Sequence, residues 1–256
     1  MLTKEQKIQF HEYGFVCLPG LFDANEIAVL SAETHRVFEL QRPEIIRTDD
    51  GQPRVAMAMH WYSDIFKFLL HHPKLLTPAN QLLGEPFYCH QFKIVTKAPF
   101  GKVPLPWHQD YGTWHETDGL PEPKAITIGI FLEEVTEFNG ALSFIPSSHL
   151  DEAMETQSEF FPGKTIKSIT LGPKVLSPLI EKHGIIAPKG KAGTVVIFDS
   201  RVVHGSGINQ TPWWRHIVYM SPNPLSNRGA KAGRDEMFAL REFEALEPNN
   251  GILINQ

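Results

Sequence analysis

Apolar residues recur at helical spacing in the first third of the chain, which predicts helices there. Thr3 and Gln6 have the spacing of a capping box, so a helix is predicted to begin at this point. Gly14 is expected to end it. Asp23 or Asn25 is predicted to cap a second helix, because both residue types accept hydrogen bonds from the free N–H groups at a helix start.

The other segments before residue 85 differ in pattern. Residues 15–19 form an apolar run after Gly14 and are predicted to be a strand. Residues 65–70 and 75–83 are predicted to be further helix, ending at Gly84. Residues 41–60 begin polar and irregular, which favours a loop near the mouth of a site.

From Pro86 onward, short runs of aromatic and β-branched residues alternate with Gly, Pro and Asn, and this pattern predicts strands. We expect a mainly β fold with flanking helices, built on a double-stranded β-helix, the cupin-like jelly roll whose mouth can hold a metal. The main predicted strands are residues 87–95, 125–132, 140–145, 193–198 and 215–220.

The length of 256 residues suits a single domain, since β barrels of this size commonly form one core. Within residues 1–256 we predict N-terminal helices, a jelly-roll core, a partly polar insert with several Pro and Gly residues inside that core, and a loop-like tail with one short charged helix. The N-terminal helices are residues 1–85 and the core is about 86–222, with the insert at 151–190. The tail is 223–256, and its charged helix is about 234–245.

Composition narrows the possible partners. The formal charge is −5 and Lys and Arg are scattered, so no basic stripe predicts nucleic-acid binding. No apolar run reaches the roughly 18 residues that span a bilayer. The two cysteines, Cys17 and Cys89, form no CxxC spacing and predict no disulfide framework. We therefore expect a cytoplasmic enzyme acting on a small molecule, as a monomer or a homodimer.

His108 and Asp110 are the first candidate metal ligands. They lie two residues apart in a segment that looks extended, where alternate side chains share a face. A second histidine, on a strand packed opposite, would complete a 2-His-1-carboxylate triad for Fe(II), and His204 follows a suitable apolar run. Zinc is the competing metal, but no cysteine lies near these residues.

Arg215 follows His204 by eleven residues, within an apolar strand. A guanidinium has a rigid fork that suits a carboxylate, and a buried arginine needs an anionic partner. We predict that Arg215 receives the distal carboxylate of a dicarboxylic co-substrate. Trp114 is either a core aromatic or a wall of the substrate site, and His115 is either a nearby supporting residue or a third histidine ligand.

Four segments together resemble the phytanoyl-CoA dioxygenase family of Fe(II)/2-oxoglutarate oxygenases, over nearly the whole chain. Within that family, the segment at His108 is similar to the signature of ectoine hydroxylases and of free amino acid hydroxylases, such as leucine 5-hydroxylases. The segments are LTKEQKIQFHEYGFV (2–16), HQDYGTWHETDGLP (108–121), NGALSFIPSSH (139–149) and FDSRVVHGS (198–206).

The resemblance implies a hydroxylase that uses Fe(II), 2-oxoglutarate and O₂. His108, Asp110 and His204 match the family's iron ligands, which are also its catalytic centre, and Arg215 matches its 2-oxoglutarate arginine. Two further residues match positions that contact substrate in ectoine hydroxylases, and two neighbours in the same signature are added as candidates. These four are Gln91, Trp114, Thr113 and His115.

Two departures affect the predicted substrate. Val95 stands where the ectoine enzymes have an asparagine near the co-substrate, and Gly129 stands where they have a serine that contacts substrate. We therefore expect a free aliphatic, leucine-like amino acid of natural-product biosynthesis. The alternatives are ectoine itself, a carrier- or CoA-tethered substrate, a zinc hydrolase, and a metal-binding cupin-like module without turnover.

Overall fold

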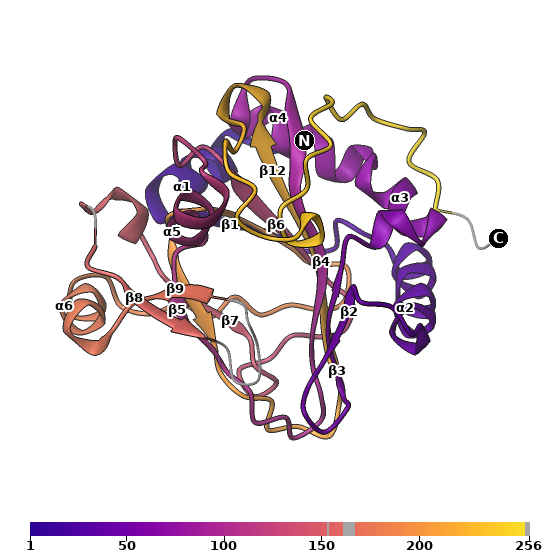
Figure 1. Cartoon of the computed structure of the whole chain (residues 1–256), viewed down its shortest axis with the longest axis horizontal. Coiled ribbons are helices and arrows are strands. Elements are labelled where there is room, and N and C mark those ends of the chain that lie inside the picture. The colour runs from indigo at the N-terminus through magenta and orange to yellow at the C-terminus, as the bar shows by residue number, and fades with distance from the viewer. Residues whose placement is uncertain (153, 161–166, 254–256) are drawn as a thin grey trace.

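Two antiparallel sheets face each other at the centre of the computed structural model, which describes residues 1–152, 154–160 and 167–253 (Figure 1). The larger sheet has the strand order β1-β10-β6-β12-β4-β3-β2. Its strands are β1 (Phe15–Leu18), β2 (Ile45–Arg47), β3 (Pro53–Met57), β4 (Phe87–Lys97), β6 (Ile126–Phe131), β10 (Val195–Asp199) and β12 (Arg215–Pro224).

The smaller sheet has the order β7-β11-β5-β9-β8. Its strands are β5 (Leu105–His108), β7 (Leu142–Ile145), β8 (Gln157–Phe160), β9 (Lys167–Thr170) and β11 (Val203–Ser206). Together with the larger sheet it forms the predicted jelly-roll core, so the expected fold class is confirmed.

Helices cover the outer sides of the two sheets. The helices α2, α3 and α4 lie beside the larger sheet, whereas α6 lies on the far side of the molecule next to β8 (Figure 1). The helices are α1 (Lys4–Tyr13), α2 (Ala24–Glu39), α3 (Asp64–Leu70), α4 (Pro73–Leu83), α5 (Asp110–Thr113) and α6 (Pro173–His183), with a π-helical turn at Trp114–Asp118 and 3-10 turns at Met59–Trp61, Ser148–Leu150, Leu225–Asn227 and Glu236–Phe238.

The predicted helix starts are confirmed. Thr3 accepts from the backbone N–H of Gln6, whose side chain accepts from the backbone of Thr3, and Gly14 ends α1 in the left-handed region at φ 81°. Asp23, rather than Asn25, caps α2, because its carboxylate accepts from two backbone N–H groups of the first turn.

The alternation of side chains along each strand divides the larger sheet into two faces. On β4, Phe92 and Ile94 point outward into the apolar cluster beneath the helices. The intervening residues of that strand, among them Lys93 and Val95, point between the two sheets and line a cavity. The strands thus carry a core on one face and a candidate site on the other.

Two segments, residues 41–60 and the tail, differ from their predicted form, and a third, the insert, contains elements that were not predicted. Residues 41–60 contain β2 and β3, which pair with each other and extend the sheet beside β4. The insert 151–190 contributes β8, β9 and α6. The tail has only the turn Glu236–Phe238 near the predicted helix, because its N–H groups bond to other elements, as Leu240 does to the carbonyl of His90.

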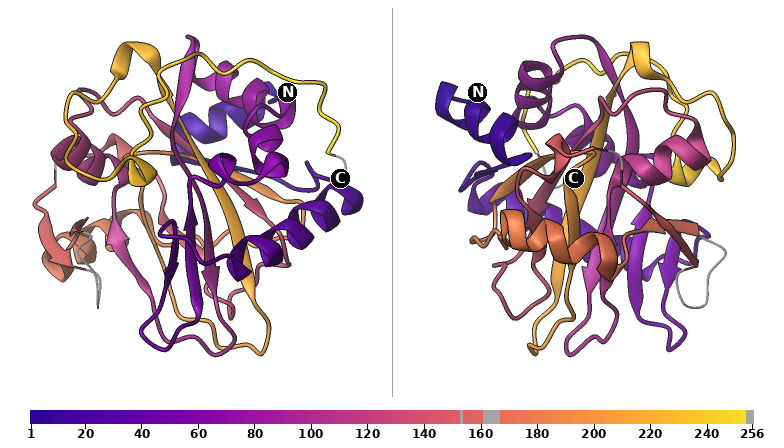
Figure 2. Two further views of the ribbon diagram at one scale, coloured as in Figure 1. Left: turned by 45° about the vertical axis from the view of Figure 1, so that its right-hand side comes forward. Right: turned by 90° about the vertical axis from the view of Figure 1, so that its left-hand side faces the viewer.

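The tail crosses the molecule from the end of β12 to the helices (Figures 1 and 2). Its backbone N–H at Asn249 bonds to the carbonyl of His71, at the end of α3. Because the larger sheet also contains β1, β2 and β3, the predicted division at residues 85 and 222 stays an interpretation. Among the described residues, no helix is long and apolar enough to cross a membrane.

Candidate functional site

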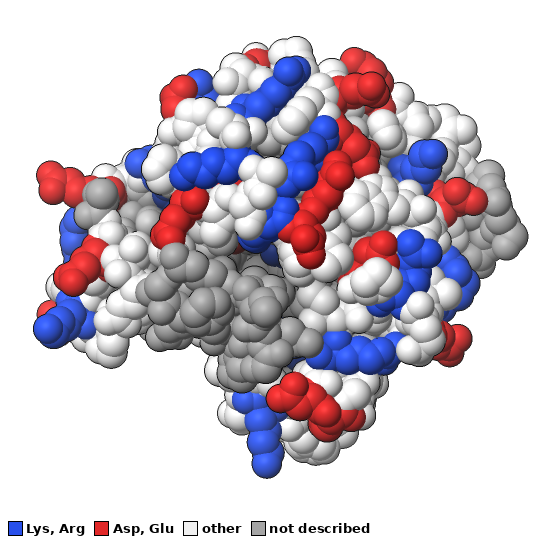
Figure 3. Space-filling view, in the orientation of Figure 1, with Lys and Arg blue, Asp and Glu red and all other residues white. Residues whose placement is uncertain are grey.

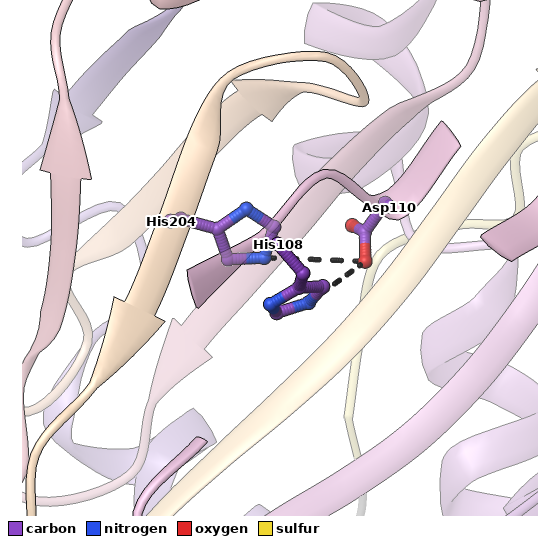
Figure 4. A group of neighbouring side chains, drawn as sticks. All are labelled: His108, Asp110 and His204. Atoms are coloured by element: carbon purple, nitrogen blue, oxygen red, sulfur yellow. Dashed lines mark ion pairs between the residues drawn. The ribbon is translucent and has the colours of Figure 1, made fainter. Parts of the chain in front are cut away.

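His108, Asp110 and His204 lie together between the two sheets (Figure 4). His108 ends β5 and is the direct cross-strand neighbour of His204 on β11. The possible ligand atoms of the three side chains all lie within 4.8 Å of one another. The structure therefore brings together the predicted metal-ligand set.

The local geometry differs from the prediction in two respects. His204 lies on the strand next to His108 in the same sheet, not on a strand packed opposite. Asp110 begins helix α5 instead of continuing the strand. Gln109 between them is still extended, at φ −112° and ψ 131°, so the side chains of His108 and Asp110 project to the same side.

The hydrogen bonds of the two imidazoles leave one nitrogen of each ring available. Nδ1 of His108 donates to the carbonyl of Pro106 at 2.8 Å, and Nδ1 of His204 donates to that of Val202 at 3.0 Å. Because a carbonyl only accepts, each ring carries a proton on Nδ1, and Nε2 is the nitrogen that remains for a metal. These Nε2 atoms lie 3.6 and 3.9 Å from Oδ1 of Asp110.

Asp110 is oriented by a separate hydrogen bond. The hydroxyl of Thr127 donates to Oδ2 at 3.0 Å, which turns Oδ1 towards the imidazoles. Burial raises the pKa of this carboxyl, but the neighbouring His108, His204 and Lys93 lower it below its ordinary value. Burial, followed by the neighbouring His108, lowers the pKa of His204 to about 4.

A metal binds imidazole through an unprotonated nitrogen and a carboxyl in its ionised form, and the two Nε2 atoms and Oδ1 of Asp110 are the atoms that face one another here. Two nitrogen ligands and one oxygen ligand on one side of an ion suit octahedral Fe(II) and leave positions for further ligands. The described residues around the triad contribute no thiolate, which a structural zinc site commonly uses.

A cavity of about 240 Å³ opens beside the triad. It follows the inner faces of β4 and β12, where Lys97 pairs with Arg215 and Gln91 pairs with Ser221. Since a strand rises about 3.3 Å per residue, the Arg215 end and the Gln91 end are roughly 20 Å apart. A hollow with Lys and Arg side chains on its rim lies near the centre of the face in Figure 3.

At one end of the cavity, Arg215 is a buried cation with unused donors. Its exposed fraction is 1%, and its Nη2 donates to the carbonyl of Gly140 at 2.7 Å. Within the described part of the chain, its Nε and Nη1 atoms have no hydrogen-bond partner. Lys97 is also buried there and donates to the carbonyl of Val103 at 2.9 Å.

This end of the cavity suits an anion. Burial, together with the positive charges of Arg215 and Arg54, lowers the pKa of Lys97 to about 7. Burial likewise lowers the pKa of Arg215. Unpaired N–H groups on a buried guanidinium are costly, and a carboxylate would satisfy two of them at once.

Tyr219 lies between the anion-binding end and the triad. It is the cross-strand neighbour of Gly129, and it lines the cavity. Burial raises the pKa of its hydroxyl to about 12, whereas the nearby Arg215 lowers it. The hydroxyl is therefore a neutral hydrogen-bond donor at physiological pH.

At the other end, Gln91 and Lys93 form a polar pair. The Lys93 ammonium donates to Oε1 of Gln91 at 2.9 Å, and Nε2 of Gln91 donates to the backbone carbonyl of Phe238 at 2.6 Å. Burial lowers the pKa of Lys93, and the nearby Asp110 raises it. Trp114 lines this end as well; its exposed fraction is 2%.

Of the other two predicted substrate residues, Thr113 lies in the cavity wall and His115 does not. Thr113 lines the cavity, and its hydroxyl accepts from the backbone N–H of Ile169 at 3.3 Å. His115 is exposed and does not line the cavity; its Nδ1 lies 2.8 Å from the carbonyl of Leu120. It points away because the chain turns helical after His108 instead of staying extended.

Sequence reasoning missed many residues of the cavity wall, and five of them contribute to the argument for the site. For three of them a signal existed, since polar Lys93 and Lys97 alternate with apolar residues along β4, and Tyr219 lies four residues after Arg215 on β12. Arg234 and Phe238 come from the tail, where no local pattern indicates a contact with the cavity.

Comparison with known proteins gives consistent matches. A family model described as phytanoyl-CoA dioxygenase (PhyH) matches residues 10–217. An ectoine dioxygenase of Bordetella bronchiseptica is 34% identical over 266 aligned residues, covering 96% of this chain and 85% of that protein. An L-proline trans-4-hydroxylase of Streptomyces griseoviridis is 27% identical and covers 95% of each chain.

The structural match agrees. The crystal structure of EctD from S. alaskensis with 2-oxoglutarate and 5-hydroxyectoine has a TM-score of 0.86 at 30% identity, covering 99% of this chain and 89% of that one. The epimerase SnoN, at 19% identity and a TM-score of 0.71, shares the fold. These relatives support the predicted ectoine alternative better than the leucine-like substrate that we expected first.

Proposed function

The chain belongs to the phytanoyl-CoA dioxygenase (PhyH) family, and from this premise we propose that it hydroxylates a C–H bond of a small, ring-shaped zwitterion of the ectoine type. It is an Fe(II)- and 2-oxoglutarate-dependent dioxygenase that acts on a small substrate, with O₂ as the oxidant. The substrate's identity and the role of each residue are proposals.

The observation that carries the substrate proposal is the position of Lys93. Its ammonium contacts Gln91 and lies close enough to Asp110 for their charges to interact. A substrate carboxylate that pairs with Lys93 would place the remainder of a small molecule beside the triad. Gln91 supplies an amide that can bond to the polar groups of a ring, and Trp114 supplies an apolar wall.

We assign the iron to His108, Asp110 and His204. When bound there, iron supplies the oxygen activation and C–H cleavage that no side chain can perform. The protein holds the target carbon and excludes water. Arg215 is assigned to the distal carboxylate of 2-oxoglutarate, because its Nε and Nη1 donors are buried and unpaired within the described part of the chain.

A second candidate is a cyclic amino acid such as proline, since one relative is an L-proline trans-4-hydroxylase. Proline and ectoine both combine a ring with a carboxylate, and both would use Lys93. They differ at the ring nitrogen, where ectoine carries an amidine and proline a secondary amine. The polar neighbours at the Gln91 end must distinguish these two groups.

The deciding experiment measures succinate formation with Fe(II), ascorbate and 2-oxoglutarate against ectoine, proline and leucine. Stimulation by ectoine, with a product heavier by one oxygen atom, is the expected result. Stimulation by proline alone would establish the second candidate. Stimulation by leucine alone would support the leucine-like substrate, and no stimulation by any of the three would reject the ectoine-type proposal together with both of these alternatives.

Lys93→Met gives a sharper test of the assigned carboxylate contact. It keeps an unbranched side chain of similar length and removes the charge. We expect a higher KM for the substrate and an unchanged KM for 2-oxoglutarate. Lys124→Met, at an exposed position outside the cavity, is the matched control. Equal substrate KM values in the two variants would remove Lys93 from the site.

A further inference from the structure

The tail after β12 contributes two residues to the cavity wall, although it lies beyond the segment that the family model matches. Arg234 and Phe238 line the same end of the cavity as Gln91 and Lys93. The ribbon views show this segment folded back over the sheets before the chain continues to α3 (Figures 1 and 2). One wall of the proposed substrate compartment is therefore made by a segment beyond residues 10–217, the stretch that the family model matches.

A buried ion pair fixes this segment. Arg234 donates through Nε to Oδ1 of Asp118 at 2.8 Å and through Nη2 to Oδ2. The side chain of Asp118 is 2% exposed and that of Arg234 is 13% exposed. Oδ2 also accepts from Nε2 of His90 at 3.0 Å, so a guanidinium and an imidazole converge on one carboxylate.

The carboxylate also connects the tail to the helical turn that follows the iron ligands. Asp118 ends the π-helical turn that begins at Trp114. The backbone N–H of Lys231 donates to the carbonyl of Asp118 at 3.0 Å. The backbone at Gly233 packs so closely that a side chain there would meet the carbonyl of Thr117. The tail thus has a defined position relative to the cavity.

A second set of bonds transmits this position to the substrate end. The carbonyl of Phe238 accepts from the amide of Gln91 at 2.6 Å, and the backbone N–H of Leu240 donates to the carbonyl of His90 at 2.9 Å. Gln91 also accepts from Lys93. The orientation of the amide that faces the substrate therefore depends on where the tail holds the carbonyl of Phe238.

We infer that Asp118 and Arg234 are positioning residues that hold the tail as the outer wall of the substrate compartment, and that Phe238 limits the size of the zwitterion this compartment accepts. The inference rests on the proposed function for the identity of the compartment. The opposite end, at Arg215, has no contact with the tail among the described bonds, so 2-oxoglutarate binding is independent of it.

The test compares Asp118→Asn with Asp235→Asn. Both variants remove one carboxylate, but Asp235 is exposed and has no part in the pair. Asp118→Asn is expected to raise the substrate KM by about tenfold or more, since loss of one partner of a buried ion pair is severe. The KM for 2-oxoglutarate should stay within about twofold of the parent value, and Asp235→Asn should match the parent in both.

A readout without substrate keeps the inference testable if the panel yields no activity. The backbone N–H groups of Lys231 and Leu240 are expected to exchange with deuterium faster in Asp118→Asn than in the parent, by a larger factor than the amides of β4. Equal exchange at both tail positions would refute the tether. An increase by the same factor throughout β4 would mean that Asp118 supports the fold in general, and would also refute it.

Phe238→Ala tests the size limit. We expect the variant to accept bulkier zwitterions that the parent rejects, with a raised KM for the parent's best substrate. An unchanged ranking of substrates would overturn the role of Phe238. This failure differs from failure of the proposed function, which would appear in the parent enzyme as the absence of stimulation by ectoine and proline.

Discussion

The ring of Tyr219 fills the space that a side chain at residue 129 would need. Gly129 and Tyr219 are cross-strand neighbours on β6 and β12, and a Cβ at residue 129 would lie 2.9 Å from Cε1 of the tyrosine. The missing side chain lets this tyrosine lie flat against β6, with its hydroxyl near Arg215. The two residues act as one unit at the anion-binding end.

Gly129→Ser should therefore displace Tyr219. We expect a loss of about 1–3 kcal/mol in the free energy of unfolding, because the added atoms overpack a closed site. The KM for 2-oxoglutarate should rise as well, since the hydroxyl moves away from Arg215. Gly207→Ser is the matched control, because a Cβ at Gly207 meets nothing within 4 Å. Thermal unfolding and a 2-oxoglutarate titration of both variants measure the two effects; equal behaviour would contradict the packing argument.

Arg215 should set the affinity for the co-substrate. Arg215→Ala is expected to raise the KM for 2-oxoglutarate roughly 100-fold, because it removes charge-assisted hydrogen bonds from a buried site. Arg215→Lys keeps the charge but loses the planar fork, so its KM for 2-oxoglutarate should lie between that of the parent and that of Arg215→Ala. Titration of 2-oxoglutarate at saturating substrate checks this order. A variant with normal 2-oxoglutarate KM and raised substrate KM would place Arg215 at the wrong end of the cavity.

The three proposed ligands should control metal content. His108→Ala, Asp110→Ala and His204→Ala are each expected to lose bound iron and all turnover. His115→Ala is the matched control, because its side chain is exposed and outside the cavity. Iron analysis after anaerobic loading gives the result. Full iron content in His204→Ala, or iron loss in His115→Ala, would require a different ligand set.

Acid should weaken the link between the tail and the turn after Trp114. Burial raises the pKa of Asp118, but the hydrogen bonds from His90 and Arg234 lower it below its ordinary value. A lowered carboxyl pKa stabilises the folded state above the unfolded pKa of about 4, and this stabilisation disappears as the pH falls through the folded value. At neutral pH the free energy of unfolding of the parent should exceed that of Asp118→Asn by about 3 kcal/mol.

Urea unfolding of both proteins between neutral pH and pH 3 tests this sign. The difference between the parent and Asp118→Asn should shrink as the pH falls below about 4. A difference that grows on acidification would show that the carboxylate is not the stabilised form.

The sequence predicted those parts of the site that depend on local pattern. His108 and Asp110 lie in one short segment, and His204 and Arg215 each follow an apolar run, so their roles could be inferred from spacing. The local conformation was harder to predict, because the change from strand to helix at Asp110 depends on distant hydrogen bonds. One example is the bond from the backbone N–H of Tyr111 to the carbonyl of Ser200. Such distant contacts placed His115 outside the cavity.

The tail was the least predictable part. Arg234 and Phe238 lie in a polar stretch without apolar periodicity, and their position depends on Asp118 and Gln91, more than 100 residues earlier. No helical or strand period encodes bonds between such distant segments. The hairpin of β2 and β3 was not predicted for a related reason. Its strands are short, and the hairpin is stabilised by the pairing of β3 with β4.

The direct pairing of His108 with His204 has a consequence beyond catalysis. The strands β5 and β11 have four residues each, and their pairing shifts register between His204 and Ser206. An ion bound by both rings would cross-link these two short strands, and it could bind only while the strands are paired. Because a ligand that binds only the folded form suppresses opening, iron supply should govern how long this protein resists proteases as well as how fast it turns over.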